Sequence, residues 1–546
     1  MRLFTPLPRS VTRPISLVVV VAWAATMAVL VHRSYGQGTT VNLATDLARY
    51  GPTAVWRGIY YRGEKIGFTV SQTTRTDTGF ELREEGRLQM LLLGQDTAAT
   101  LRTVARVDAR FVLQSFEFAL DPGTGAIEVR GTVDPPRAGG EPYRLTLTIV
   151  SAGVPRTDVR ELPDVPVIPM NLPRMLASGG LVPGSRHRWT VLDPATLQNA
   201  PMEIAVGERS IVRAGDARVP AFRVDLEFRG LRTTSWVTDT GEVVREESPL
   251  GLLTIRETPE RAQGLAVSSR VREDLLRAAA VVPVMPQPIA EPRDVRRLRV
   301  RLEGAELPAG DLDGVGQSAE GNVIELRDPQ FLRPEPLDPT ASTYLHPEPL
   351  IESDAPEIRA EAEAAVRGAG TDRLRAERLT RYVNSLLDKK PTVSLPSARE
   401  VLRTKVGDCN EHTALYVAMA RAVGLPARIA VGLVFMRGAF YYHAWPEVYL
   451  REGDGTGLWL PVDPTLNQFP ADATHLRLTR GGLDKQAVIL PLIGRLRMTV
   501  LDLELAPGSV PVLVGRDLAA GLAGARLDVP PAPAAGCSCG DSGGAR

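Results

Sequence analysis

One cysteine, one histidine and one aspartate follow each other along the last third of the chain, each beside the start or end of a short predicted element. They are Cys409, His443 and Asp463. A thiolate can attack a carboxamide carbonyl, an imidazole can pass a proton to the departing amine, and a carboxylate can orient that imidazole. These residue types in this order indicate nucleophilic thiol chemistry on amide bonds.

Cys409 is predicted to begin a helix. Asp408 and Glu411 have the spacing of an acidic capping box, and Gly424 with Pro426 marks a stop. At the first helical turn, unpaired backbone N–H groups and the positive end of the helix dipole favour a thiolate and can stabilise an oxyanion. We therefore expect the pKa of Cys409 to lie below that of a simple thiol.

Strands are predicted to carry the other two residues. The apolar run 428–435 is joined by a short turn to the alternating run 440–449, whose alternation puts His443 and Glu447 on one face. A third strand candidate ends at Asp463. Glu447 is an alternative orienting acid, but at ~3.3 Å per residue it lies about 13 Å along the strand from His443. Asp463 can approach from a neighbouring strand, so it is the preferred partner.

Three blocks in this segment resemble the transglutaminase-like superfamily. They are Gly-Asp-Cys-x-Glu-His around Cys409, Tyr-His-Ala-Trp-x-Glu-Val around His443, and Val-Asp-Pro-Thr around Asp463. The resemblance spans residues 397–465 and implies a papain-like fold, in which a helix bearing the cysteine packs on an antiparallel sheet bearing the histidine and the aspartate. It also implies that Cys409 is the nucleophile, His443 its base, and Asp463 the group that orients the imidazole.

A zinc site is the main alternative for these residues. Cys409 and His412 form a C-x-x-H pair, to which His443 would add a third ligand. A single thiolate with no fourth ligand nearby argues against zinc. We therefore expect neither a metal nor another cofactor, and we expect His412 to support the site or to occupy a helix face.

The chain is too long for one hydrophobic core, because single domains usually stop growing near ~250–300 residues and this chain has 546. The fold class is predicted to be α+β. The predicted divisions are a cytoplasmic stub and signal anchor at 1–36, one or more β-rich domains at 37–277, a linker with a small β segment at 278–345, the transglutaminase-like catalytic domain at 346–505, and a largely disordered tail with Cys537 and Cys539 at 506–546.

An uncharged, mostly apolar stretch near the N-terminus, residues 14–31, is long enough to cross a bilayer core. Three arginines precede it, which favours a cytoplasmic N-terminus. No clear small-x-small cleavage site follows, so we expect a retained signal anchor. The prediction is a bacterial single-pass protein of the inner membrane, with the catalytic domain on the periplasmic side.

Charge excludes one class of partner. Lys+Arg and Asp+Glu both number 64, so the formal net charge is zero and no nucleic-acid partner is expected. The predicted function is an exported, membrane-anchored cysteine protease or amidase that hydrolyses a peptide or protein substrate in the cell envelope. Two alternatives stay open: protein-glutamine acyl transfer, which is transglutaminase cross-linking, and a non-catalytic envelope binding module.

Overall fold

The computed structural model describes residues 53–508, except 137–140, 194–197, 216, 229, 265–273 and 309. The predicted signal anchor at 14–31 and the tail cysteines Cys537 and Cys539 lie outside the described residues. Among the helices that are described, none has both the length and the apolar character needed to cross a membrane.

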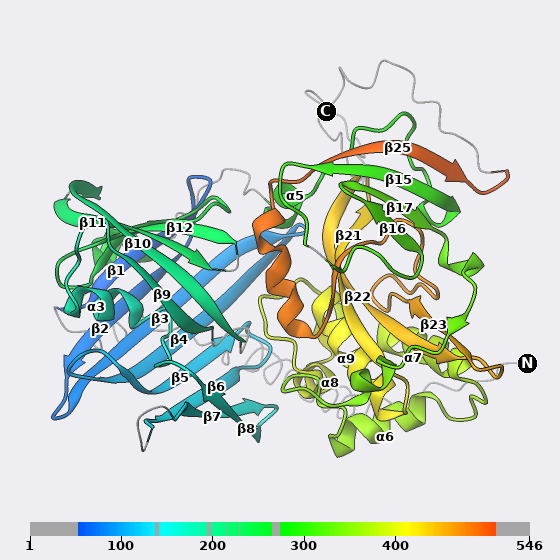
Figure 1. The fold of residues 1–546 in the computed structure, drawn as a ribbon, viewed down its shortest axis with the longest axis horizontal. Coiled ribbons are helices and arrows are strands. Elements are labelled where there is room, and N and C mark those ends of the chain that lie inside the picture. Colours follow the sequence, from blue (N-terminus) through cyan, green and yellow to red (C-terminus); the bar gives the residue numbers. More distant parts are fainter. Residues whose placement is uncertain are drawn as a thin grey trace, which may run out of the picture.

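The N-terminal half is one antiparallel sheet of 14 strands that curves strongly (Figure 1). Its strand order runs from β8 down to β1 and then from β14 down to β9, so β1 (Val55–Tyr61) pairs with β14 (Leu252–Glu257). The other strands are β2 Glu64–Arg75, β3 Gly79–Leu92, β4 Gln95–Asp108, β5 Leu113–Asp121, β6 Ile127–Asp134, β7 Tyr143–Ser151, β8 Val154–Leu162, β9 Arg186–Asp193, β10 Gln198–Ala214, β11 Ala217–Phe228, β12 Leu231–Val237 and β13 Val243–Glu247.

Alternating apolar residues and tight turns explain this sheet. In β7, Leu145, Leu147 and Ile149 are at most 1% exposed, while the residues between them are partly exposed. The turn between β1 and β2 places Arg62 and Gly63 at φ 48° and 88°, the left-handed pair that a two-residue hairpin requires. The prediction of a β-rich N-terminal half is confirmed. Three short helices accompany the sheet: α3 Leu172–Ser178, α4 Pro259–Gln263 and α5 Leu275–Ala279.

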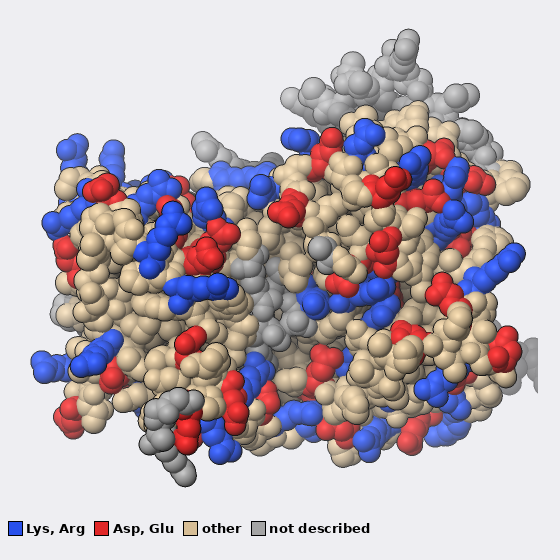
Figure 2. Space-filling view, viewed as in Figure 1, with Lys and Arg blue, Asp and Glu red and all other residues tan. Residues whose placement is uncertain are grey.

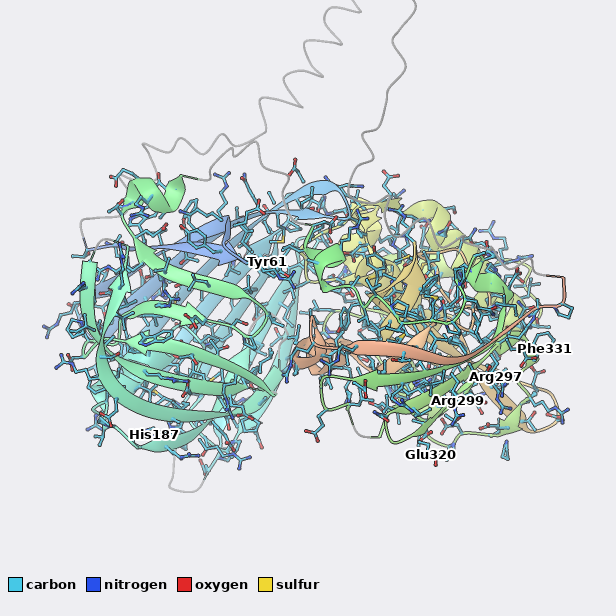
Figure 3. The ribbon with its side chains drawn as sticks, turned by 90° about the horizontal axis from the view of Figure 1, so that it is seen from above. Tyr61, His187, Arg297, Arg299, Glu320 and Phe331 are labelled. Carbon is cyan, nitrogen blue, oxygen red and sulfur yellow. The ribbon has the colours of Figure 1, made fainter. Side chains whose placement is uncertain are left out.

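A second, four-stranded sheet joins two distant parts of the chain. Its order is β16 (Gln317–Glu320), β17 (Val323–Arg327), β15 (Val295–Glu303) and β25 (Arg497–Leu505). The small β segment that follows the predicted linker therefore shares a sheet with the last strand described. Arg297 lies on β15 in Figure 3 and forms an ion pair with Asp502 of β25 at 2.6 Å.

The third unit combines helices with a five-stranded sheet. The helices are α6 Pro356–Ala365, α7 Asp372–Leu386, α8 Ala398–Thr404 and α9 Cys409–Ala422. The sheet order is β18 (Glu335–Pro336), β23 (Thr456–Pro461), β22 (Ala439–Arg451), β21 (Ala427–Met436) and β24 (Leu476–Gly481). A two-stranded pair, β19 Asp388–Lys389 with β20 Val406–Gly407, precedes α9, and short 3-10 turns lie at Pro292–Asp294, Pro329–Phe331, Ala341–Leu345 and Leu483–Leu492. Helix α9 packs against α6, α7 and β22, so its residues from Ala414 to Ala420 are fully buried.

Polar contacts, one buried and one exposed, join the N-terminal sheet to the helical unit. Glu352 accepts hydrogen bonds from Ser151 of β7 at 2.9 Å and from Ser397 at 2.7 Å. Arg403 of α8 donates to the carbonyl of Thr124, between β5 and β6, at 3.1 Å. On the face shown in Figure 2, basic and acidic side chains are interspersed over both halves, as the balanced composition implies.

Candidate active site

Helix α9 begins at Cys409, as the sequence predicts. The carboxylate of Asp408 accepts from the amide of Asn410 at 2.9 Å, and Glu411 accepts from the amide of Asp408 at 2.8 Å, so the capping box is complete. Gly407 makes room for this return of Glu411, because a Cβ at residue 407 would lie 2.2 Å from the Glu411 Cβ. Glycine and the two acids of this block therefore place the cysteine at the first helical turn.

His443 and Asp463 are in direct contact. His443 lies on β22 opposite Gly432 of β21, and Asp463 follows the end of β23. The two side chains are 5% and 0% exposed, and Nε2 of His443 lies 2.8 Å from Oδ2 of Asp463. Because the carboxylate accepts the hydrogen on Nε2, the neutral imidazole keeps its lone pair on Nδ1.

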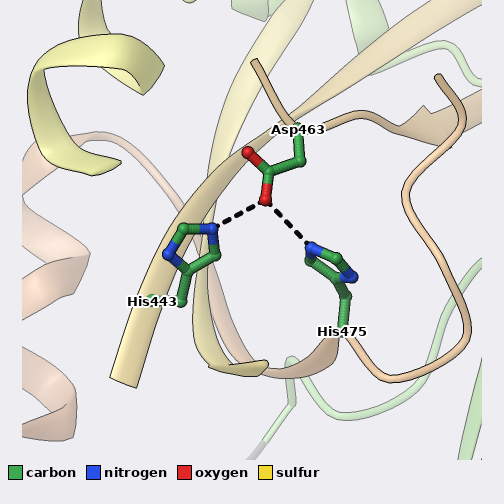
Figure 4. Close-up of side chains that lie close together, drawn as sticks. All are labelled: His443, Asp463 and His475. Atoms are coloured by element: carbon green, nitrogen blue, oxygen red, sulfur yellow. Dashed lines mark hydrogen bonds and ion pairs between the residues drawn. The ribbon is translucent and has the colours of Figure 1, made fainter. Parts of the chain in front are cut away.

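Four donors surround the Asp463 carboxylate. Oδ1 accepts from the backbone amides of Thr465 at 2.7 Å and Leu466 at 2.9 Å. Oδ2 accepts from His443 at 2.8 Å and lies 3.1 Å from Nε2 of His475 (Figure 4). Burial alone would raise the pKa of Asp463, but the two histidines hold it well below its usual value. The carboxylate is thus ionised and fixed in one orientation.

Cys409 reaches β22 at the residue after His443. The backbone N–H of Ala444 donates to the Cys409 sulfur, and the hydroxyl of Thr413, one turn along α9, donates to the carbonyl of Ala444 at 3.1 Å. These two contacts dock the first turn of the helix on the strand that carries the histidine. Among the described contacts there is no hydrogen bond between Cys409 and His443 themselves.

The expected lowering of the Cys409 pKa is wrong in direction. Burial of the half-buried thiol raises its pKa well above the usual value, and the neighbouring Asp408 carboxylate raises it further. The backbone amide of Ala444 favours the thiolate, but its effect on the pKa is smaller than that of burial and of Asp408. The helix N-terminus favours the thiolate, but the acids of the capping box lie beside the sulfur and disfavour it. In this arrangement the thiol is protonated at neutral pH.

His475, just before β24, is a second buried histidine that sequence reasoning missed. Its Nε2 faces Asp463, and its Nδ1 lies 3.2 Å from Oδ1 of Asp472. Gly432 admits this segment, because a Cβ there would lie 1.9 Å from the carbonyl oxygen of Leu476. The sequence contains one indication of this histidine: Asp472 lies three residues before His475, and both follow closely after the Val-Asp-Pro-Thr block.

Residues 359–464 match the family model described as the transglutaminase-like superfamily. This segment is a transglutaminase-like core. The predicted resemblance is confirmed, and the match ends one residue after Asp463. No curated protein matches the chain.

Three solved structures align with parts of the chain at low identity. A candidate cysteine protease from Cytophaga hutchinsonii aligns at 16% identity over 40% of this chain and 89% of its own, with a TM-score of 0.25. A β-barrel-like protein from Brucella abortus aligns at 13% identity over 38% of this chain and 96% of its own, with a TM-score of 0.29. A candidate protease from Parabacteroides distasonis aligns at 10% identity over 62% of this chain and 64% of its own, with a TM-score of 0.18.

Glu447 has a different role in the transglutaminase-like core. Its carboxylate is 2% exposed and bonds to Arg428 at 2.7 Å and to Arg477 at 2.6 Å. Burial would raise the pKa of Glu447, but the two guanidinium groups lower it to about 2. Glu447 is therefore committed to a buried ion-pair cluster that joins β21, β22 and β24.

Three side chains of the core also have the composition of a cation site. The ligand atoms of His443, Asp463 and His475 all lie within 4.8 Å of one another. The same atoms form the hydrogen bonds described above, and His475 uses its other nitrogen on Asp472. The zinc alternative that the sequence argued against combined Cys409 and His412 with His443. His412 is fully buried, with Nδ1 2.7 Å from the carbonyl of Asp408.

Proposed function

We propose that this protein is a thiol enzyme that breaks amide bonds through an acyl-thioester on Cys409, and that water normally resolves the thioester. The observation that carries the proposal is the buried 2.8 Å contact between His443 and Asp463, with Cys409 docked on the adjacent residue of the same strand. This contact leaves Nδ1 of His443 as a base and a carboxylate behind it to stabilise the imidazolium.

The chemistry starts from a neutral thiol, since the pKa of Cys409 is raised. As sulfur bonds to the amide carbon, the thiol proton moves to Nδ1 of His443. The imidazolium then returns that proton to the amine nitrogen as the C–N bond breaks. Water next adds to the thioester, again with His443 as base, and breaks the C–S bond to give a carboxylic acid and the free thiol.

One expected oxyanion donor is already in use. The amide of Asn410, in the first turn of α9, donates to Asp408 at 2.9 Å. An oxyanion formed at Cys409 therefore needs donors other than this capping amide.

The test uses the full chain and a library of envelope peptides. Mass spectrometry follows each peptide with and without a small primary amine, and Cys409→Ala is compared with Cys537→Ala, which removes a cysteine outside the three blocks. Hydrolysis appears as the addition of one water across an amide bond of the peptide. This product should be absent with Cys409→Ala and unchanged with Cys537→Ala. Amine incorporation without hydrolysis would favour acyl transfer, and neither product would favour the binding module.

The location is proposed from sequence alone. We propose that residues 14–31 anchor the chain in the inner membrane and place the catalytic domain in the periplasm. A C-terminal reporter that fluoresces only in the cytoplasm should stay dark. A bright reporter would contradict this topology.

A further inference from the structure

His475 is a buried histidine beside Asp463 that takes no part in the reaction proposed for Cys409, His443 and Asp463. It is 6% exposed, and Figure 4 shows the His443 and His475 rings on either side of the same Asp463 oxygen. Both of its ring nitrogens face carboxylate oxygens, Nε2 at 3.1 Å from Asp463 and Nδ1 at 3.2 Å from Asp472. Only the imidazolium form of histidine can donate from both nitrogens. The geometry therefore fits a buried cation between two carboxylates.

Asp472 is itself held rigidly. Its Oδ1 accepts from the amide and the hydroxyl of Thr474 at 2.9 and 2.6 Å, and its Oδ2 accepts from the side-chain amide of Gln468 at 2.8 Å. Gln468 in turn accepts from the backbone amide of Asp472 at 2.8 Å. The carboxylate that faces His475 is thus fixed in place by protein donors.

We propose that His475, clamped by Asp472, is a positioning residue that keeps the Asp463 carboxylate turned toward His443. The inference rests on the proposed function, because positioning matters only if His443 acts as a base. His475 and Asp472 together are neutral, so they add no net charge to the site. They fill the one remaining acceptor position of Asp463, whose other three are taken by His443 and two backbone amides. With all four positions taken, the carboxylate is held in one orientation.

The surrounding charges agree with this assignment. Burial alone would lower the pKa of His475, but the carboxylates of Asp472 and Asp463 raise it to about 10. The indole of Trp445 lies edge to face with the imidazole, with ring centroids 5.2 Å apart. Arg477, two residues farther along the chain in β24, is paired with Glu447 at 2.6 Å.

The experiment uses the full chain with ¹⁵N-labelled histidine, and the sequence contains six histidines. His475→Gln removes the cation while keeping a neutral donor, and Asp472→Asn keeps His475 while removing its counter-charge. His187→Gln is the matched control, because His187 lies on β9 in the 14-stranded N-terminal sheet and is labelled there in Figure 3. Ring-nitrogen shifts are followed from pH 5 to 10. The rate of Cys409 alkylation is measured across the same range, and kcat and KM are measured on any peptide found to be cleaved.

We expect the His475 signals to stay those of an imidazolium through neutral pH, and Asp472→Asn to lower their titration midpoint by about one unit or more. His475→Gln should shift the pH profile of Cys409 alkylation and lower kcat about 10- to 100-fold with KM within about twofold, because a charge-assisted hydrogen bond is lost. His187→Gln should do neither.

A neutral His475 at pH 7, or an alkylation profile in His475→Gln that matches the His187→Gln control, would overturn the inference. Ring shifts that change on treatment with EDTA would also overturn it, because they would show a cation in place of the proton. If the wild-type chain cleaves no amide, the proposed function fails. The shifts and the alkylation profile still decide the role of His475, because neither needs a substrate.

Discussion

Replacing Asp463 by asparagine tests how completely its carboxylate is used. The carboxylate accepts four hydrogen bonds, two at each oxygen. Asparagine has one oxygen and one NH2 group, so in either orientation its NH2 group faces two donors. If the NH2 group faces the histidines, it opposes the imidazolium of His475 and also His443 in the Nε2–H tautomer that leaves Nδ1 as a base. If it faces the chain, it opposes two backbone amides.

The expected cost follows from the two lost bonds. Hydrogen bonds to charged groups contribute about 1.5–3 kcal/mol each, so Asp463→Asn should destabilise the core by about 3–6 kcal/mol. For a unit of this size each kcal/mol lowers Tm by about 2–4 °C, which predicts a fall of about 6–24 °C. The fall should shrink as pH rises, because a neutral His475 can accept from the new NH2 group.

The change in Tm is measured by thermal melting monitored by tryptophan fluorescence, because Trp445 on β22 and Trp459 on β23 lie in the five-stranded sheet of the core. The matched control is Asp454→Asn, an exposed aspartate whose Oδ1 accepts only from Thr456, and its Tm should equal that of the wild type. A Tm for Asp463→Asn within about 2 °C of wild type at pH 7 would refute the four-donor description, since even one lost bond predicts more.

Three further outcomes are expected. In a variant without the two tail cysteines, alkylation of Cys409 by iodoacetamide at about pH 6 should be slower than that of a simple thiol, because its pKa is raised; a faster rate would contradict the described burial. Glu447→Gln should destabilise the protein by about 3–5 kcal/mol in urea unfolding, because two buried guanidinium groups lose their partner; a neutral effect would show that the cluster is hydrated. The pKa of Asp472 is lowered to about 2, so its contribution to stability should be present above about pH 4 and lost as pH falls toward 2. The pKa of His475 is raised to about 10, so its contribution to stability should be complete below about pH 6.5 and lost as pH rises toward 10. A Tm that does not change at either extreme of pH would contradict the ion pair between Asp472 and His475.

The local elements of the site could be predicted from sequence. The capping box fixes the start of α9 at Cys409, and the hairpin between β21 and β22 turns at Arg437 and Gly438, both with positive φ. These features depend on residues a few positions apart. The alternation in β22 likewise predicts that His443 and Trp445 share a face, and their rings lie stacked at 6.1 Å.

The parts that sequence missed depend on contacts between distant segments. The raised pKa of Cys409 comes from burial and from acids around the helix start, which a dipole argument omits. His475 reaches Asp463 only because Gly432 lets β24 approach β21. The pairing of β15 with β25 joins residues about 200 positions apart, and no local pattern specifies it.

The most direct test of the central claim is to trap the acyl group on Cys409. The full chain is mixed with a cleaved peptide, quenched in acid within the first turnover, and mapped by mass spectrometry. We expect a peptide acyl mass on Cys409 that hydroxylamine removes. It should be absent from Cys409→Ala and strongly reduced in His443→Ala. Turnover with no acyl group on Cys409 at any quench time, or turnover that persists in Cys409→Ala, would contradict it.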